Sequence, residues 1–109
     1  MHGNFLKNLV SRQNAVVLAA GEPGELAGFI YAGIRGPVFS VDDFVVAKPD
    51  LWPTTGRMLL DSMASEAGKA GAAEVHVVCG PKDVPKRQML VDAGYEVGSE
   101  WFVKPIPNF

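Results

Sequence analysis

The residues best suited to chemistry lie between Val45 and Arg57, where an apolar stretch meets an amphipathic one. A strand that leads into a helix gathers unpaired backbone N–H groups and the positive end of the helix dipole. Such a place suits a phosphate group. Threonine hydroxyls, a glycine and an arginine, all present here, are groups that hold anions. A simpler alternative stays open, in which Pro53 starts the helix and Thr54 or Thr55 caps it.

Two neighbouring carboxylates, Asp42 and Asp43, are candidates for a general base. They fall within a predicted strand over residues 38–47, where successive side chains point to opposite faces. The alternation assigns one face to Ser40, Asp42, Phe44 and Val46, and the other to Val41, Asp43 and Val45. The two carboxylates are therefore not expected to form an acid–base pair, although either could act singly. The alternative is a solvated or capping carboxylate at the margin of a strand.

Other site types find little support in the composition. The two histidines and the single cysteine, Cys79, have no spacing that suits zinc, so no metal site is predicted. We expect His76 to be a buried or edge histidine and Cys79 an inert core thiol. The net charge of −2 offers no basic surface for nucleic acid. A lone cysteine, no signal peptide and no apolar run of membrane-spanning length predict a cytoplasmic protein without a membrane segment.

Hydrophobic periodicity and turn residues predict one domain over residues 1–109. A short helix follows Asn4 and ends near residue 13, with Phe5, Leu6, Leu9 and Val10 on one face. The further elements are strands at 15–20, 26–34, 38–47 and 74–79, helices at 55–70 and 83–93, and extended segments at 95–97 and 101–104. The first two strands form a hairpin with a five-residue connection, in which Gly28 suggests a bulge or a close backbone approach. A βαβ unit follows, so the fold is α/β or α+β with a mixed sheet.

Four segments, in this order and spacing, resemble the GNAT superfamily of acyl-coenzyme A dependent N-acetyltransferases. The segment Gly24 to Ile30 resembles the turn that opens the family's third strand, and Asp42 to Val46 resembles its fourth strand with an acidic pair. From Val46 to Gly56 the spacing equals that from the family's strand valine to the last glycine of its R/Q-x-x-G-x-G/A signature. The stretch from Asp83 to Tyr95 resembles the last helix, which ends in G-F/Y.

The resemblance implies where acetyl-coenzyme A, the co-substrate, would bind. Pantetheine would lie between the splayed fourth and fifth strands, on the main chain of Phe44, Val45 and Val46. The pyrophosphate would lie on the segment that carries Trp52, Thr54, Thr55, Gly56 and Arg57, and the lower coenzyme near Asp83 and Lys86. The implied function is transfer of an acetyl group to a primary amine, on a small molecule or a protein. Asp42 is the first candidate for the base because it shares a strand face with Val46, and Asp43 is the second.

Departures from the family pattern support a second hypothesis. Leu51 stands where the signature has Arg or Gln, Thr54 replaces its first glycine, and Pro53 lacks an N–H. Leu90 falls where many members carry a tyrosine that protonates the leaving thiolate. We expect the chain to begin at the family's second helix, so that an uncovered sheet edge favours a homodimer. The alternative to an enzyme is a non-catalytic module of this fold that binds coenzyme A weakly, or a dimerisation or regulatory unit.

Overall fold

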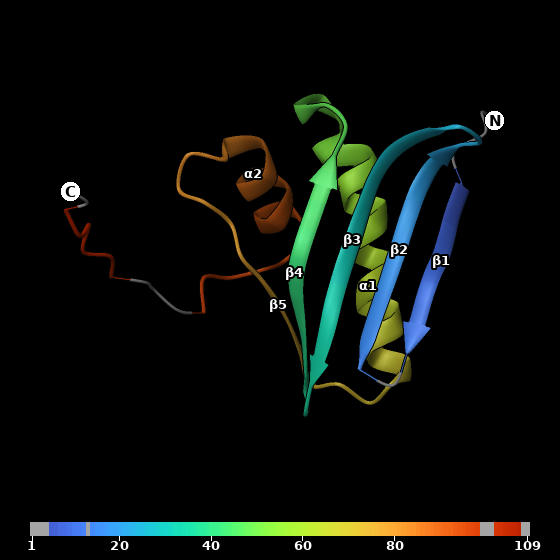
Figure 1. Ribbon diagram of the computed structural model, residues 1–109, viewed down its shortest axis with the longest axis horizontal. Coiled ribbons are helices and arrows are strands. Elements are labelled where there is room, and N and C mark those ends of the chain that lie inside the picture. The colour runs from blue at the N-terminus through green and yellow to red at the C-terminus, as the bar shows by residue number, and fades with distance from the viewer. Residues whose placement is uncertain (1–4, 13, 99–101, 108–109) are drawn as a thin grey trace.

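A computed structural model describes residues 5–12, 14–98 and 102–107. Five strands form one mixed sheet in the order β1-β2-β3-β4-β5, in which only the β4–β5 pair is parallel (Figure 1). Their bounds are Phe5–Arg12, Ala15–Glu22, Glu25–Arg35, Val38–Val46 and Glu74–Val77. The helices are α1 (Arg57–Lys69) and α2 (Val84–Asp92), and α1 is preceded by the helical turns η1 (Pro49–Leu51) and η2 (Trp52–Gly56). The predicted hairpin followed by a βαβ unit is confirmed.

The helix predicted after Asn4 is wrong, because Phe5–Arg12 forms strand β1. This strand pairs antiparallel with β2 from Phe5, opposite Gly21, to Arg12, opposite Ala15. A single short helix is marginal on its own, whereas pairing with the eight-residue β2 satisfies the backbone of both segments. The edge of β2 that was expected to be uncovered carries β1, which removes the sequence-based reason for a homodimer.

The β2–β3 hairpin is tighter than predicted. Glu22 pairs with Glu25, so Pro23 and Gly24 alone connect the strands, and Gly24 takes the positive φ of 83° that such a turn requires. Both expectations for Gly28 are met. The register shifts beside it, and a Cβ at this residue would lie 2.8 Å from the Val45 carbonyl oxygen. This glycine therefore lets β3 and β4 approach closely.

Helix α1 covers one face of the sheet, behind β2 and β3 in the view of Figure 1. An apolar stripe of α1 is buried, namely Leu59, Leu60, Met63 and Ala67. Gly71 ends the helix with a φ of 77°, as the sequence predicts. Strand β5 is two residues shorter than predicted because the chain leaves the sheet after Val77.

Helix α2 packs beside the far end of β4 and against η2. It begins after Asp83 with Pro85 in its first turn, and Gly94 follows its end with a φ of 89°. Met89 and Leu90 are buried in the same core cluster as the α1 stripe. Both helices thus contribute to one core, with Ile30, Phe39 and Val41 supplying part of the sheet side.

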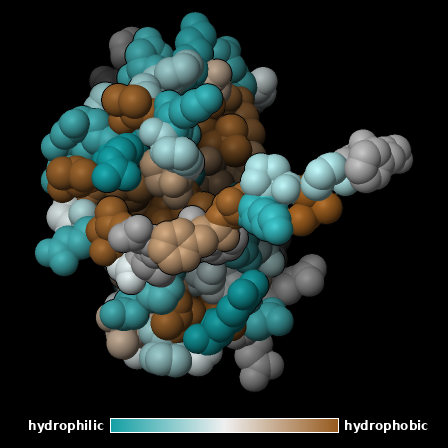
Figure 2. All heavy atoms as spheres, turned by 90° about the vertical axis from the view of Figure 1, so that its left-hand side faces the viewer, coloured by the Kyte–Doolittle hydropathy of each residue, from teal (hydrophilic) through white to brown (hydrophobic). Residues whose placement is uncertain are grey.

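The C-terminal segment follows α2 without regular structure over residues 95–98 and 102–107. The extended structure predicted from residue 101 is therefore not a strand where it is described, and Trp101 lies outside the described residues. Apolar side chains gather on the face from which the segment projects (Figure 2), and Phe102, Val103 and Ile106 are exposed. Among the described residues, no helix combines the length and apolar composition needed to cross a bilayer.

Candidate functional site

Strands β4 and β5 run side by side only briefly. The ladder joins Val38–Val41 to Glu74–Val77 and then stops, whereas β4 continues to Val46. Beyond Val41, the edge of β4 that faces away from β3 has no strand beside it among the described residues. The chain turns from β5 toward α2, so the two strands diverge (Figure 1). Main-chain groups on this part of β4 are therefore placed where an extended ligand could pair with them.

A β-bulge marks the point of divergence. Tyr31 pairs with Asp43 and Ala32 pairs with Val41, which leaves Asp42 as an extra residue on β4. The bulge shifts the alternation, so Val41 and Phe44 are both buried, three residues apart. The prediction that Asp42 shares a face with Phe44 and Val46 is wrong.

Both carboxylates lie on the exposed side of β4 as a consequence of the bulge. The prediction that strand alternation separates them is therefore also wrong. Asp42 accepts a hydrogen bond from the Ser40 hydroxyl at 3.3 Å, and its other oxygen lies 3.8 Å from an Arg35 guanidinium nitrogen. The structure thus places two acidic groups beside the divergence, and the original reason for preferring Asp42 over Asp43 does not hold.

The junction before α1 differs from the predicted helix start. Helical turns begin at Pro49, where Leu51 N–H donates to Lys48 O at 3.0 Å and Trp52 N–H donates to Pro49 O. The Arg57 N–H donates to the carbonyls of Thr54 and Trp52. Since this amide is bonded internally, the N-terminal end of the helical run lies about two turns earlier than the sequence predicts.

The alternative interpretation of the junction, in which Pro53 starts the helix and Thr54 or Thr55 caps it, is also wrong. Neither η2 nor α1 has a side-chain cap, and the Thr54 hydroxyl donates to Leu51 O at 3.4 Å instead. Thr55 is buried, with 4% of its surface exposed. Pro53 has no N–H to offer a phosphate. The β4 edge thus fits the pantetheine part of coenzyme A, whereas the main chain of the junction fits its pyrophosphate poorly.

A cluster of three side chains ties the junction to β4 and α2. The Trp52 ring is buried and packs edge-to-face against Phe44, with ring centroids 4.9 Å apart. The Lys86 ammonium lies 5.6 Å from the centroid of Phe44 and 5.5 Å from that of Trp52. These are cation–π distances. The structure therefore brings together three of the residues predicted to bind the coenzyme.

Gly56 has a packing role that the sequence did not suggest. A Cβ at Gly56 would lie 2.6 Å from Cε3 of Trp52, so the indole ring occupies the space that a side chain would take. Its φ of −60° and ψ of −46° are ordinary helical values. The absence of a Cβ is thus explained by the Trp52 ring and requires no bound phosphate.

The guanidinium of Arg57 is engaged in an ion pair with Asp61. Its Nε lies 3.1 Å from both carboxylate oxygens of Asp61. Tyr95 lies near this ion pair, and its pKa is raised by burial and by the Asp61 carboxylate, while Arg57 lowers it. Since a phenol with its ordinary pKa is already protonated at neutral pH, the upward shift matters only in alkali. This group of residues forms a contact between α1 and the segment after α2.

The remaining candidate residues contact other groups of the protein. Leu90, at the expected tyrosine position, is only 8% exposed and packs in the core. Cys79 is partly buried with its thiol directed at Gly80 O and Asp83 O, at 3.5 and 3.7 Å. His76 is exposed on β5 with its Nε2 2.8 Å from a Glu74 oxygen, which fits the edge histidine predicted. Within the described ranges, no group of His, Cys, Asp or Glu could hold a metal ion.

Comparison with known proteins identifies the fold. No family model matches the chain, and no curated protein matches it in sequence. Among solved structures, it is similar to the aminoglycoside N-acetyltransferase AAC(6')-Iy in complex with CoA, with a TM-score of 0.74 and 15% identity over 89% of this chain and 79% of the other. It is also similar to a ribosomal-protein-alanine N-acetyltransferase from Brucella melitensis biovar Abortus 2308, with a TM-score of 0.68 and 17% identity over 90% and 76%.

These structures define the class of protein to which the architecture corresponds. The chain has the fold of the GNAT acetyltransferases, with 85–93% of its length covered by such structures. The same fold is found when AAC(6')-Iy holds a bisubstrate analogue, CoA-S-monomethyl-acetylneamine, at a TM-score of 0.71. At identities of 15–21% this likeness concerns the fold, and function has to be argued from the site.

Proposed function

We propose that the chain binds an acyl-coenzyme A thioester along the free edge of β4 and transfers the acetyl group to a primary amine. The observation that carries this proposal is the divergence of β4 from β5 at the Asp42 bulge. It leaves the main chain up to Val46 beside no other strand among the described residues. An extended pantetheine arm, which carries two amide groups, can pair with such an edge as an added strand would.

Each part of the site has a defined task in this proposal. The main-chain N–H groups of Phe44 and Val46, which face away from β3, hold the pantetheine arm and polarise the thioester carbonyl, and Val45 lies between them. Lys86, held over two aromatic rings, supplies positive charge for the coenzyme phosphates in place of the junction amides. The Thr54 hydroxyl, which is exposed, adds a polar contact.

The acceptor must lose a proton before it can attack, because a protonated amine has no free electron pair. Asp42 and Asp43 are both exposed on the same side of β4, so either carboxylate can take that proton directly or through water. The amine nitrogen attacks the acetyl carbon and the carbon–sulfur bond breaks. The departing coenzyme A thiolate takes the proton that the new amide nitrogen gives up, and the proton held by the carboxylate is released to water. Comparing Asp42→Asn with Asp43→Asn in an acetyl-transfer assay over a panel of amines identifies the base.

Thermal unfolding with and without acetyl-CoA tests the binding step. A ligand at one hundred times its dissociation constant adds about 2.7 kcal/mol to the free energy of unfolding. Thr54→Asp places a carboxylate at an exposed residue beside the proposed phosphate position, and we expect it to abolish the shift. Ser65→Asp, the matched control, adds the same charge to an exposed residue of α1. An absent shift for the unaltered protein at millimolar acetyl-CoA would refute the proposal.

A second candidate function is a coenzyme-binding module without catalysis. Burial of Leu90 in the core leaves no phenol at the position expected to protonate the thiolate. The internal bonding of the Arg57 amide also removes a donor from the phosphate position. This alternative predicts a thermal shift with acetyl-CoA but no acetylated product with any amine. The proposal of an enzyme predicts both the thermal shift and the acetylated product.

A further inference from the structure

Strand β5 ends the sheet with an unpaired edge. The order β1-β2-β3-β4-β5 leaves no strand on its outer side among the residues that the structure describes. On the inner side, the Ala73 N–H donates to Pro37 O, just before β4, at 2.7 Å. Because backbone groups alternate between the two edges of a strand, the N–H and C=O of His76 point outward, away from β4. This edge can therefore accept one further strand.

The segment over residues 102–107 has the composition of such a strand, yet it pairs with no strand in the described part of its own chain. It extends away from the body of the molecule, at the left of Figure 1. Its large apolar side chains are exposed, to 97% for Phe102, 81% for Val103 and 74% for Ile106. Aromatic and β-branched residues favour strands. Exposed apolar groups gathered in one segment indicate a surface that another surface covers.

Two prolines restrict this segment to pairing through one edge. In an extended chain, the N–H groups of the even-numbered residues Phe102, Lys104 and Ile106 point to one edge, and those of the odd-numbered residues point to the other. Pro105 and Pro107, both on the odd side, have no N–H. Proline within a sheet is confined to edge strands. The segment is therefore suited to add to a sheet and to end it there.

Charge and apolar contacts match the segment to β5. Directly opposed residues of an antiparallel pair either both turn their N–H groups toward the shared edge or both turn them away. Lys104 would therefore share a face with His76 and Glu74, whose side chains are exposed and meet at 2.8 Å. Opposite charges stabilise such cross-strand neighbours. Val103 would lie on the other face beside Val75, which packs against the core.

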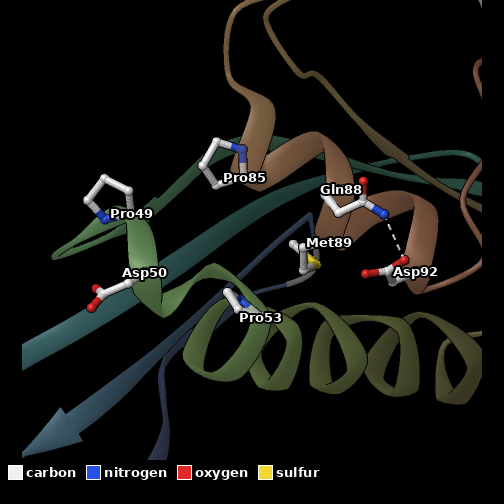
Figure 3. Close-up of a pocket in the computed structure, with 7 residues that line it drawn as sticks. All are labelled: Pro49, Asp50, Pro53, Pro85, Gln88, Met89 and Asp92. Carbon is white, nitrogen blue, oxygen red and sulfur yellow. Dashed lines mark hydrogen bonds between the residues drawn. The ribbon is translucent and has the colours of Figure 1, made fainter.

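A cavity of about 500 Å³ is the other place that could receive an apolar side chain of the segment. It lies between the helical turns before α1 and helix α2, and its lining includes Pro49, Asp50, Pro53, Pro85 and Met89 (Figure 3). Helices bond their main-chain groups internally, and prolines have no N–H. The cavity thus offers no edge to an extended segment, whereas β5 does.

We propose that residues 102–107 of one copy add as an antiparallel strand to the β5 edge of a second copy, which does the same in return. The segment leads away from its own β5, so the edge is open to the segment of another copy (Figure 1). A two-fold exchange uses both edges and both segments, and the assembly closes as a dimer. The proposal does not depend on acetyl-CoA, since neither the segment nor the outer edge of β5 belongs to the proposed coenzyme site.

Sedimentation equilibrium of the full chain without acetyl-CoA tests for the dimer. We expect Val103→Ser to raise the dimer dissociation constant about tenfold or more, because two buried valine side chains are lost from each dimer. Val91→Ser, the matched control, removes an exposed valine from α2 and should leave the constant unchanged. Circular dichroism establishes that each variant is folded. A chain that stays monomeric up to millimolar concentration would overturn the proposal.

Charge reversal distinguishes a second copy from the segment's own chain. Glu74→Lys and Lys104→Glu should each weaken the dimer, whereas Asp50→Lys, at the cavity, should not. In an equimolar mixture, one isotope-labelled, the Glu74→Lys and Lys104→Glu chains should prefer the heterodimer to either homodimer, because both contacts then pair opposite charges. Native mass spectrometry measures this preference. Random mixing, or a dimer weakened by Asp50→Lys and not by Glu74→Lys, would overturn the proposal whether or not acetyl-CoA binds.

Discussion

Replacing Gly56 with alanine should lower the free energy of unfolding, although alanine is the better helix former. The substitution in an ordinary helix interior gains about 1 kcal/mol. At Gly56, the new Cβ would lie 2.6 Å from a ring atom of Trp52 that is itself buried. Forcing a methyl group into a packed core costs typically 1–3 kcal/mol. We therefore expect a net loss of up to about 2 kcal/mol, which corresponds to as much as several degrees in the midpoint of thermal unfolding.

Gly68, which lies in α1, provides the matched control further along the same helical run. It is exposed, and nothing lies within 4 Å of a Cβ built there. Gly68→Ala should raise the free energy of unfolding by about 0.5–1 kcal/mol. Urea denaturation monitored by circular dichroism measures both changes in the free energy of unfolding, and we expect the same dependence on urea concentration for both variants.

The Trp52 ring can be tested directly as the cause. In a Trp52→Leu background, the ring edge is gone, so Gly56→Ala should become neutral or stabilising. A coupling energy of at least about 1 kcal/mol between the two substitutions is expected for residues in contact. If Gly56→Ala and Gly68→Ala stabilise the protein equally, the ring does not fill the space at Gly56. A stable Gly56→Ala variant that loses acetyl-CoA binding would instead assign this glycine to the coenzyme.

Three further outcomes are expected from individual contacts. Tyr95→Phe should reduce the loss of stability in alkali. Burial and Asp61 raise the phenol pKa above its ordinary 10.0, so the native state keeps its proton to higher pH than the unfolded state, and the stability of the unaltered protein falls as pH rises above about 10. An equal loss of stability above pH 10 in the variant, measured by urea denaturation, would contradict this. Lys86→Gln should lower the free energy of unfolding by about 0.5–1 kcal/mol through loss of the cation–π contacts, and Lys82→Gln, at an exposed residue, should not. Gly28→Ala should cost roughly 1–3 kcal/mol because its Cβ would meet a main-chain oxygen of β4 at 2.8 Å, whereas Gly80→Ala meets nothing within 4 Å and should be near neutral in thermal unfolding.

Local signals predicted most of the elements because they report on local conformation. Gly71 and Gly94 end helices with positive φ, and Pro85 starts one, as their residue types indicate. The N-terminal segment shows where such signals fail. Its apolar residues have helical spacing, yet it forms β1, since pairing with β2 decides its conformation. A contact of this kind depends on the whole fold and not on the segment's own sequence.

The site was predicted less completely than the fold. The bulge at Asp42 has one sign in the sequence. The buried residues Val41 and Phe44 are three residues apart, which breaks the alternation of buried and exposed side chains in a regular strand. Pro49 and Pro53 are both residues of the kind that begin helices, so residue type does not distinguish between them. A helical run that contains Pro53 is accommodated by the wider turn η2, which local rules do not anticipate. The contact of Trp52 with Gly56 depends on side-chain placement and had no sequence signal.

Hydrogen exchange of the β4 amides with and without acetyl-CoA tests the central claim most directly. If the coenzyme lies along the free edge of β4, the Phe44 and Val46 amides, which face away from β3, should exchange more slowly when it is bound. Amides of β4 before Val41, which are already paired with β5, should change little. Slower exchange confined to other segments, or no change in β4 at saturating acetyl-CoA, would contradict the account.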